Sequence, residues 1–150
     1  MRILLAVDGS PHSLQAADEI AHRPWPSGTV VRVLSAVQAV APPAVDFGLA
    51  SGVTFDQLQQ EQTRNAHELT KDISRRLEAA SLRAETAVLD GDPGRVILDE
   101  AQNWGADLIV VGSHGHSKLE RWILGSVARS IVDNAPCSVE VVRRREAQAA

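Results

Sequence analysis

The chain has 150 residues, a length that fits a single domain over residues 1–150, and 44% of them are hydrophobic, enough to bury a core. The formal net charge of -4 argues against a global basic field, so we expect no nucleic acid and no anionic membrane as a partner. No apolar stretch approaches the ~20 residues of a transmembrane helix. The single cysteine, Cys137, excludes an intrachain disulfide and fits a reducing, cytoplasmic compartment.

The first third of the chain is predicted to form a strand, a helix and a second strand. Residues 3–7 are continuously apolar, as in a parallel strand covered on both faces, and this run is too short for a signal peptide. Ser10 is a suitable N-cap and Pro11 suits the first turn of a helix, which we expect to end before Pro24. The valine-rich residues 29–37 favour a second strand.

The middle third is predicted to begin with a loop and to continue as a long helix. Prolines and glycines favour a loop over residues 38–53. Thr54 and Gln57 match a capping box, so a helix is expected to follow. Its apolar stripe consists of Ala66, Leu69, Ile73, Leu77 and Ala80. Residues 83–89 are predicted to form the third strand.

The last third repeats the alternation of helix and strand. Asp92 is a suitable N-cap and Pro93 suits the first turn of the next helix. Short apolar runs favour strands at residues 108–111 and 138–142, with a helix at about residues 126–134 between them. This alternation predicts an α/β fold in which a parallel sheet lies between two helical layers.

A group of glycines after the fourth predicted strand is the most informative motif. Gly112 and Gly115 follow that strand, and Gly125 with Ser126 opens the last helix, in the spacing Gly-x2-Gly-x9-Gly-Ser. Glycine lets backbone approach a ligand closely. A Gly-Ser pair at a helix N-terminus offers N–H groups, a hydroxyl and the positive end of a dipole. The spacing therefore predicts a phosphate-binding loop.

Several other motifs of nucleotide and hydrolytic chemistry do not occur in the sequence. It contains no Gly-x4-Gly-Lys-Ser/Thr, no Gly-x-Gly-x2-Gly after the first strand and no Gly-x-Ser-x-Gly. The run from Ser113 to His116 lacks the first histidine of a His-x-Gly-His nucleotidyl transferase motif. These motifs therefore give no support to a P-loop, a Rossmann site or a nucleophile elbow.

The glycine motif resembles the signature of the nucleotide-binding, ATP-binding branch of the universal stress protein family. Three further segments resemble that family in register: residues 3–10, the turn at residues 91–93 and the last strand with its approach, residues 136–142. The resemblance covers nearly the whole chain in order.

This resemblance implies an open five-stranded parallel sheet of order 3-2-1-4-5, with helices on both faces, as in adenine nucleotide alpha hydrolase-like folds. Such a sheet has a topological switch point between strands 1 and 4, where ligands of open α/β sheets bind. The two loops that meet there begin with Asp8 and with Gly112. The implied site and the glycine motif therefore fall in the same crevice.

The resemblance also implies which residues contact ATP. Asp8 would face the ribose hydroxyls or a phosphate-bound Mg²⁺; the alternative is a turn-forming aspartate. Val37 would read the adenine edge through its backbone, or would be plain core. The full set of expected ATP contacts is Ala6, Asp8, Val37, Val111, Gly112, Gly115, Gly125, Ser126 and Val127.

The side chains inside the glycine loop leave alternatives open. His114 and His116 are either a metal site or general base, or residues that shape the loop, and no Cys, Asp or Glu stands beside them to complete a metal shell. Lys118 and Arg121 would neutralise phosphate charge or be solvated. Trp122 and Ile123 would pack the loop down or face a partner subunit.

The leading interpretation is an ATP-binding regulatory protein of the stress response that acts as a homodimeric, nucleotide-dependent switch. Its ligands would be ATP, ADP or AMP, with Mg²⁺, and its protein partner is unknown. Of the alternatives, one is a slow ATPase or autophosphorylating enzyme, with at most weak hydrolysis, and the other is a structural stress protein that does not bind nucleotide. The resemblance implies a homodimer in which the last strand pairs through Val139, Val141 and Val142.

Overall fold

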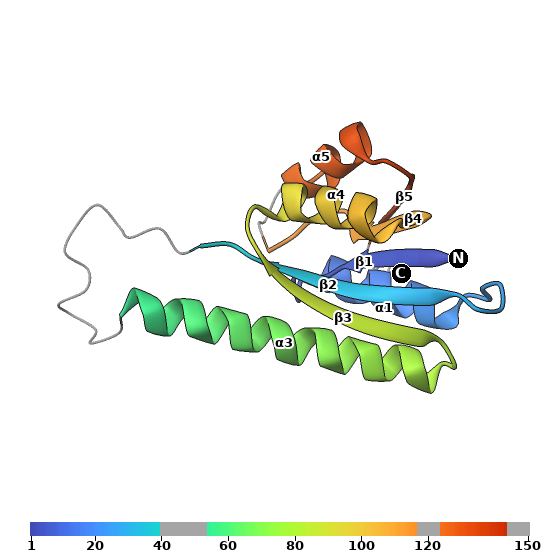
Figure 1. Ribbon diagram of the computed structural model, residues 1–150, viewed down its shortest axis with the longest axis horizontal. Coiled ribbons are helices and arrows are strands. Elements are labelled where there is room, and N and C mark those ends of the chain that lie inside the picture. The colour runs from blue at the N-terminus through green and yellow to red at the C-terminus, as the bar shows by residue number, and fades with distance from the viewer. Residues whose placement is uncertain (40–53, 117–123, 144–150) are drawn as a thin grey trace, which may run out of the picture.

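The computed structural model of the chain describes residues 1–39, 54–116 and 124–143 (Figure 1). All strands and helices expected within these ranges are present, with ends that differ by at most a few residues. In chain order they are β1 (Arg2–Ala6), α1 (Pro11–His22), β2 (Val30–Val37), α3 (Phe55–Ala79), β3 (Arg83–Asp90), α4 (Pro93–Trp104), β4 (Leu108–Gly112), α5 (Ser126–Asn134) and β5 (Ser138–Val142).

The five strands form one parallel sheet in the order β3-β2-β1-β4-β5, which confirms the predicted topology. Strand β1 lies in the middle, with Ala6 opposite Leu34 of β2 and Leu5 opposite Val110 of β4. The chain first builds outward from β1 to β3 and then returns to add β4 and β5 on the other side. The carboxyl ends of β1 and β4 therefore border the switch point.

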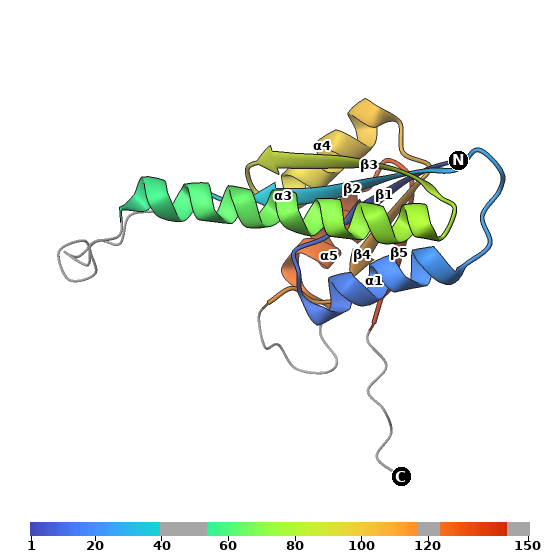
Figure 2. The same cartoon turned by 90° about the horizontal axis from the view of Figure 1, so that it is seen from below.

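Helices cover both faces of the sheet, α1 and α3 on one and α4 and α5 on the other (Figures 1 and 2). Alternate side chains of β1 enter the two cores: Ile3 and Leu5 pack towards α1 and α3, and Leu4 and Ala6 towards α4 and α5. The continuous apolar run of this strand is thus explained by burial on both faces.

The predicted capping residues begin their helices as expected. The Ser10 hydroxyl accepts a hydrogen bond from the Ser13 N–H at 3.3 Å, and the Asp92 carboxylate accepts one from the Arg95 N–H at 3.0 Å. Thr54 and Gln57 form the reciprocal capping box at the start of α3. The local sequence therefore fixes where these helices enter the fold.

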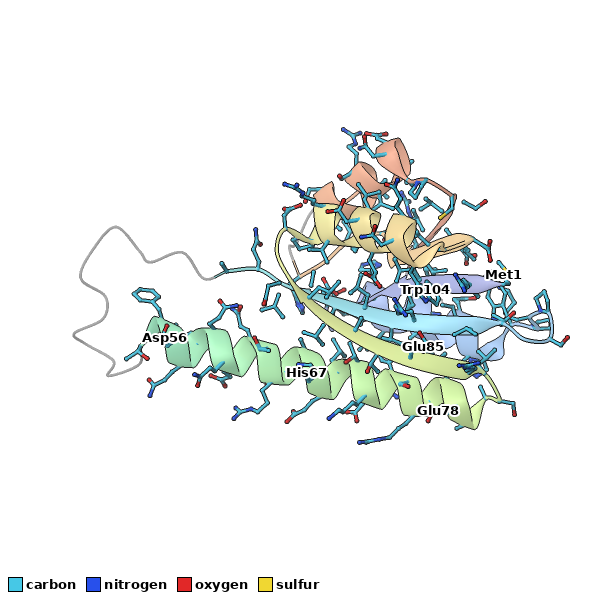
Figure 3. The ribbon with its side chains drawn as sticks, viewed as in Figure 1. Met1, Asp56, His67, Glu78, Glu85 and Trp104 are labelled. Atoms are coloured by element: carbon cyan, nitrogen blue, oxygen red, sulfur yellow. The ribbon has the colours of Figure 1, made fainter. Side chains whose placement is uncertain are left out.

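Helix α3 runs beyond the end of the sheet at its N-terminal side (Figures 1 and 2). Asp56, His67 and Glu78 mark its length in Figure 3. The predicted apolar stripe is buried at Ala66, Ile73 and Leu77, but Ala80 is exposed, because the helix ends at Ala79 and Ala80 is its C-cap. None of the helices in the described ranges combines the length and apolarity needed to cross a membrane.

Helix α4 is attached to the sheet by a charged cluster around Trp104. The Arg32 guanidinium of β2 lies 4.5 Å from the Trp104 ring centre and forms ion pairs with Glu85 of β3 and Glu100 of α4 (Figure 3 labels Glu85 and Trp104). Arg2 donates a hydrogen bond to the Trp104 carbonyl at 2.8 Å. These contacts hold the C-terminal end of α4, and so help to fix where its N-terminal end meets the strand exits.

Candidate nucleotide-binding site

A cavity of about 260 Å³ opens at the carboxyl ends of β1, β2 and β4, where they meet the N-termini of α4 and α5. This is the switch point of the sheet. The cavity is lined by Ala6, Val7, Asp8, Ser13, Leu34, Ala36, Pro93, Ile97, Val111, Gly112, Ser113, His114, Gly115, His116, Gly125, Ser126, Val127 and Ala128.

One wall of the cavity is apolar and continues the core beneath α4 and α5. Ala6, Leu34, Ile97 and Val111 line it and also belong to that core. The lining also carries carboxylate, hydroxyl and imidazole groups together with the N-terminus of α5. A planar apolar group and an anionic group can therefore be bound side by side.

Most of the residues expected from the sequence lie together in this lining. They are Ala6, Asp8, Val111, Gly112, Gly115, Gly125, Ser126 and Val127. Val37 lies outside the lining: its side chain is 4% exposed, and its carbonyl accepts a hydrogen bond from the Gly91 N–H at 3.0 Å. Strand β2 instead contributes Leu34 and Ala36.

Asp8 has the geometry of one of the two roles that the sequence left open. One carboxylate oxygen accepts a hydrogen bond from the Ser10 N–H at 2.9 Å, which is the geometry of a turn-forming aspartate. The side chain is nevertheless exposed and lines the cavity, so it has capacity to accept further bonds. A carboxylate of this kind fits the usual Mg²⁺ site, in which one or two carboxylates and phosphate oxygens bind the ion.

A Cβ atom added at any of the motif glycines would lie close to other atoms of the protein. A Cβ atom at Gly112 would lie 2.7 Å from the His12 carbonyl carbon and 2.8 Å from the Ser13 nitrogen. At Gly125 it would lie 3.0 Å from the Ser113 carbonyl oxygen, and at Gly115 2.8 Å from the Asp8 carboxylate. At Gly112 the nearest atoms are backbone of α1, so the contacts of the chain with itself require this glycine. At Gly115 the nearest atom is the end of the Asp8 side chain, which can move.

The N-terminus of α5 differs from those of the other described helices. Gly125 is its N-cap, and within the described part of the chain no side chain caps it. Ser126, Val127 and Ala128 occupy its first turn and line the cavity. A first helical turn has N–H groups without intrahelical partners and carries roughly half a positive charge. This end of the cavity is therefore suited to an anion.

Three histidines gather around the polar side of the site. Nδ1 of His12 and Nδ1 of His114 lie 3.1 and 3.0 Å from the Ser113 hydroxyl. Nε2 of His116 contacts the Asp8 carbonyl, and because a carbonyl only accepts, this nitrogen carries the hydrogen. Among the described residues, no three His, Cys, Asp or Glu side chains come together to hold a metal ion.

The sequence-based reasoning missed several lining residues, and some could have been found. The even-numbered residues of β2 share the face of the sheet that holds the cavity, and helix N-termini that follow parallel strands meet at one edge. This reasoning would have indicated Leu34, Ala36 and Pro93. Ser113 carries no comparable signal, because its role depends on contacts with three distant segments.

Some expectations fall on residues outside the described ranges. These are Lys118, Arg121, Trp122 and Ile123 of the glycine loop, and the predicted loop from residue 40 onwards.

Comparison with known proteins shows the family of the chain. A model of the universal stress protein family matches residues 1–143. The chain is 31% identical to universal stress protein MJ0531 of Methanocaldococcus jannaschii over 143 residues, which is 95% of this chain and 82% of that protein.

Solved structures share the fold. The structure of MJ0577 from the same organism superposes with a TM-score of 0.82 at 23% identity, covering 97% of both chains. A family protein from Arabidopsis thaliana with AMP bound gives 0.71 at 18% identity, over 97% of this chain and 92% of that one. The Archaeoglobus fulgidus protein in complex with dAMP gives 0.63 at 24% identity, over 95% and 97%.

Proposed function

Because this chain belongs to the universal stress protein family, we propose that it binds an adenine nucleotide in the cavity at the switch point and acts as an ATP-binding regulatory protein of the stress response. The observation that carries the proposal is the N-terminus of α5, which has no side-chain cap in the described chain and opens into a cavity with an apolar wall. Nucleotides bound to relatives, AMP in one structure and dAMP in another, support the same ligand class.

The cavity offers separate surfaces for the two halves of a nucleotide. The nucleoside would pack against the apolar wall formed by Ala6, Leu34 and Val111. The phosphates would accept hydrogen bonds from the Ser126 hydroxyl and from the N–H groups of Ser126 and Val127. Asp8 would hold a phosphate-bound Mg²⁺ or the ribose hydroxyls, and bound Mg²⁺ would offset phosphate charge.

We further propose that nucleotide occupancy acts as a switch in a cytoplasmic homodimer that an unidentified protein partner reads. Strand β5 is an edge of the sheet, and edge strands are usually paired or protected. Val139 and Val141 are only half-buried in the single chain. Antiparallel pairing of β5 through Val139, Val141 and Val142 would cover this edge.

The first test is nucleotide binding itself. Native mass spectrometry of the purified protein should reveal co-purified adenine nucleotide, and calorimetric titration should give saturable binding of ATP, ADP or AMP. Ser126→Ala should weaken binding by about tenfold, because a hydrogen bond to a charged group contributes roughly 1.5–3 kcal/mol. Ser126 is exposed, so the free energy of unfolding should stay within about 0.5 kcal/mol of wild type.

The matched control for this variant is Ser27→Ala, another exposed serine, which lies in the turn before β2. It should leave nucleotide affinity unchanged. If the wild type carries no nucleotide and shows no heat of binding, the proposal is wrong and the chain is a non-binding member of the family. If bound ATP turns over well above background and His116→Ala abolishes the turnover, the enzyme alternative replaces the switch.

A further inference from the structure

We infer that Ser113 is a positioning residue, which sets the place of the anion-binding N-terminus of α5 without contacting the ligand through its hydroxyl. The inference rests on the proposed nucleotide site and assigns to that site a residue beyond the glycine motif. It starts from the burial of Ser113, which is 0% exposed although it is one of the residues at the cavity.

Ser113 connects directly to the start of α5. Its carbonyl accepts a hydrogen bond of 2.8 Å from the N–H of Gly125, the N-cap of that helix. A Cβ atom at Gly125 would lie 3.0 Å from the same oxygen, so the two segments are in tight contact. Any displacement of Ser113 therefore moves the helix start that carries Ser126 and Val127.

Three further hydrogen bonds hold Ser113 itself in place. Its N–H donates to the carbonyl of Val142 at the end of β5, at 2.8 Å. Its hydroxyl bridges Nδ1 of His12 in α1 and Nδ1 of His114, at 3.1 and 3.0 Å. A hydroxyl has one donor and two acceptor sites, so it can donate to one imidazole and accept from the other.

The surroundings leave Ser113 little freedom to shift. The preceding Gly112 lies against the backbone of α1, where a Cβ atom would come within 2.7 Å of the His12 carbonyl carbon. The Ser10 hydroxyl donates to the following carbonyl, that of His114, at 3.3 Å. The strand end, α1 and the loop are thus tied together at Ser113, whose hydroxyl contacts both imidazoles.

Position matters at this site because hydrogen bonds weaken steeply as their angle departs from linearity. Backbone N–H groups aimed at a phosphate lose strength if the helix start tilts or slides. The nucleoside packs against non-directional apolar contacts, which tolerate such a shift better. Loss of the Ser113 hydroxyl should therefore weaken binding of the phosphate and leave binding of the nucleoside nearly unchanged.

The test compares AMP with adenosine in calorimetric titrations of the full-length chain. Ser113→Ala should lower AMP affinity about tenfold, the loss expected for one charged hydrogen bond, while adenosine affinity stays within about twofold. His12→Leu should lower the AMP-to-adenosine affinity ratio in the same direction. His12→Asn, whose amide can replace Nδ1, should keep the ratio within about twofold of wild type.

Ser74→Ala is the control, since it removes a buried serine hydroxyl from α3, away from the cavity lining. It should change neither affinity. Equal losses for AMP and adenosine in Ser113→Ala, or an unchanged ratio in both Ser113→Ala and His12→Leu, would overturn the positioning role and leave the proposed function standing. A wild type that binds neither ligand would overturn both.

Discussion

The glycines of the motif are explained first by the contacts of the chain with itself. Neither Gly112, Gly115 nor Gly125 has the positive φ that favours glycine on conformational grounds. A Cβ atom would instead come within 3.0 Å of another segment at each of them, although at Gly115 that atom is the end of the Asp8 side chain, which can move. At Gly112 that segment is backbone of α1, which cannot rotate away as a flexible side chain can.

Replacing Gly112 with alanine should therefore destabilise the protein even without nucleotide. We expect Gly112→Ala to lower the free energy of unfolding by about 2–3 kcal/mol, a typical result of overpacking. Urea denaturation of nucleotide-free protein measures this. Gly28→Ala is the comparison, because a Cβ atom there meets nothing within 4 Å and only the φ of +78° opposes it, for about 1 kcal/mol. A Gly112→Ala protein of wild-type stability that no longer binds nucleotide would reverse this explanation.

The parts of the candidate site that depend on short sequence patterns were predictable from the sequence. The apolar periodicity predicts where the strands end, and the Gly-Ser pair predicts where α5 begins. Asp8, Gly112 and Ser126, which lie at these points, line one cavity. Val37 was expected to contact the base through its backbone, which stays a prediction, and its side chain lies outside the cavity lining because side chains of a strand alternate between faces. It follows the parity of Val33, which packs towards α1 and α3, whereas the cavity lies on the α4 and α5 face.

At the level of elements, helix α1 and strand β5 are joined by an ion pair at the sheet edge. The Arg23 guanidinium donates two hydrogen bonds to the Glu140 carboxylate, at 2.6 and 2.7 Å, which is bidentate geometry. Hydrogen bonding from Arg23 lowers the pKa of Glu140 below its ordinary value, against a smaller opposing effect of burial. Both side chains are partly exposed, so the pair contributes about 0.5–1 kcal/mol.

This ion pair predicts a pH dependence of stability. Because the pKa of Glu140 is lower in the folded than in the unfolded chain, its contribution is complete above the ordinary glutamate pKa of about 4.3 and is lost as pH falls through the lowered folded value. The stability difference between wild type and Glu140→Gln should be constant from about pH 8 to 5 and should shrink at more acidic pH. Urea denaturation across this range measures it.

A double-mutant cycle provides the control for the ion pair. Arg23→Gln and Glu140→Gln should show a coupling energy of about 0.5–1 kcal/mol at pH 7, which should shrink as Glu140 protonates. Strictly additive effects at pH 7 would contradict the assignment of the pH dependence to this pair.

The elements themselves were predicted well because their boundary signals are local. Ser10, Thr54 and Asp92 cap their helices through neighbours three residues away, and such short-range chemistry is readable in the sequence. The long-range contacts were not readable. Glu140 pairs with Arg23, which is far away in the sequence. Ser113 joins α1, α5 and β5, which only the folded chain brings together.

For the whole molecule, the order of the strands in the sheet decides which strands have an unpaired edge. Strand β3 forms one edge and β5 the other. The proposed homodimer uses β5, and light scattering coupled to size exclusion should give the mass of two chains at micromolar concentration. Ser138→Lys should shift the protein towards one chain, because lysine on an exposed edge strand opposes strand pairing.

The control for the dimer test is Gln60→Lys, which adds the same charge to the exposed face of α3. It should leave the mass unchanged. A wild type that elutes as one chain at micromolar concentration would show that β5 does not pair in this way.

The steric requirement at Gly112 also affects whether the glycine motif can be used to recognise nucleotide-binding members among related sequences. Selection for folding alone would keep Gly112 in a descendant that had lost its ligand, since the backbone of α1 lies against it. The presence of Gly112 therefore shows that the loop has been retained and does not by itself indicate that a ligand is bound. Ser126 is exposed and lines the cavity, so its identity reports retained binding better than the glycines do, whereas Asp8 also holds the turn at Ser10.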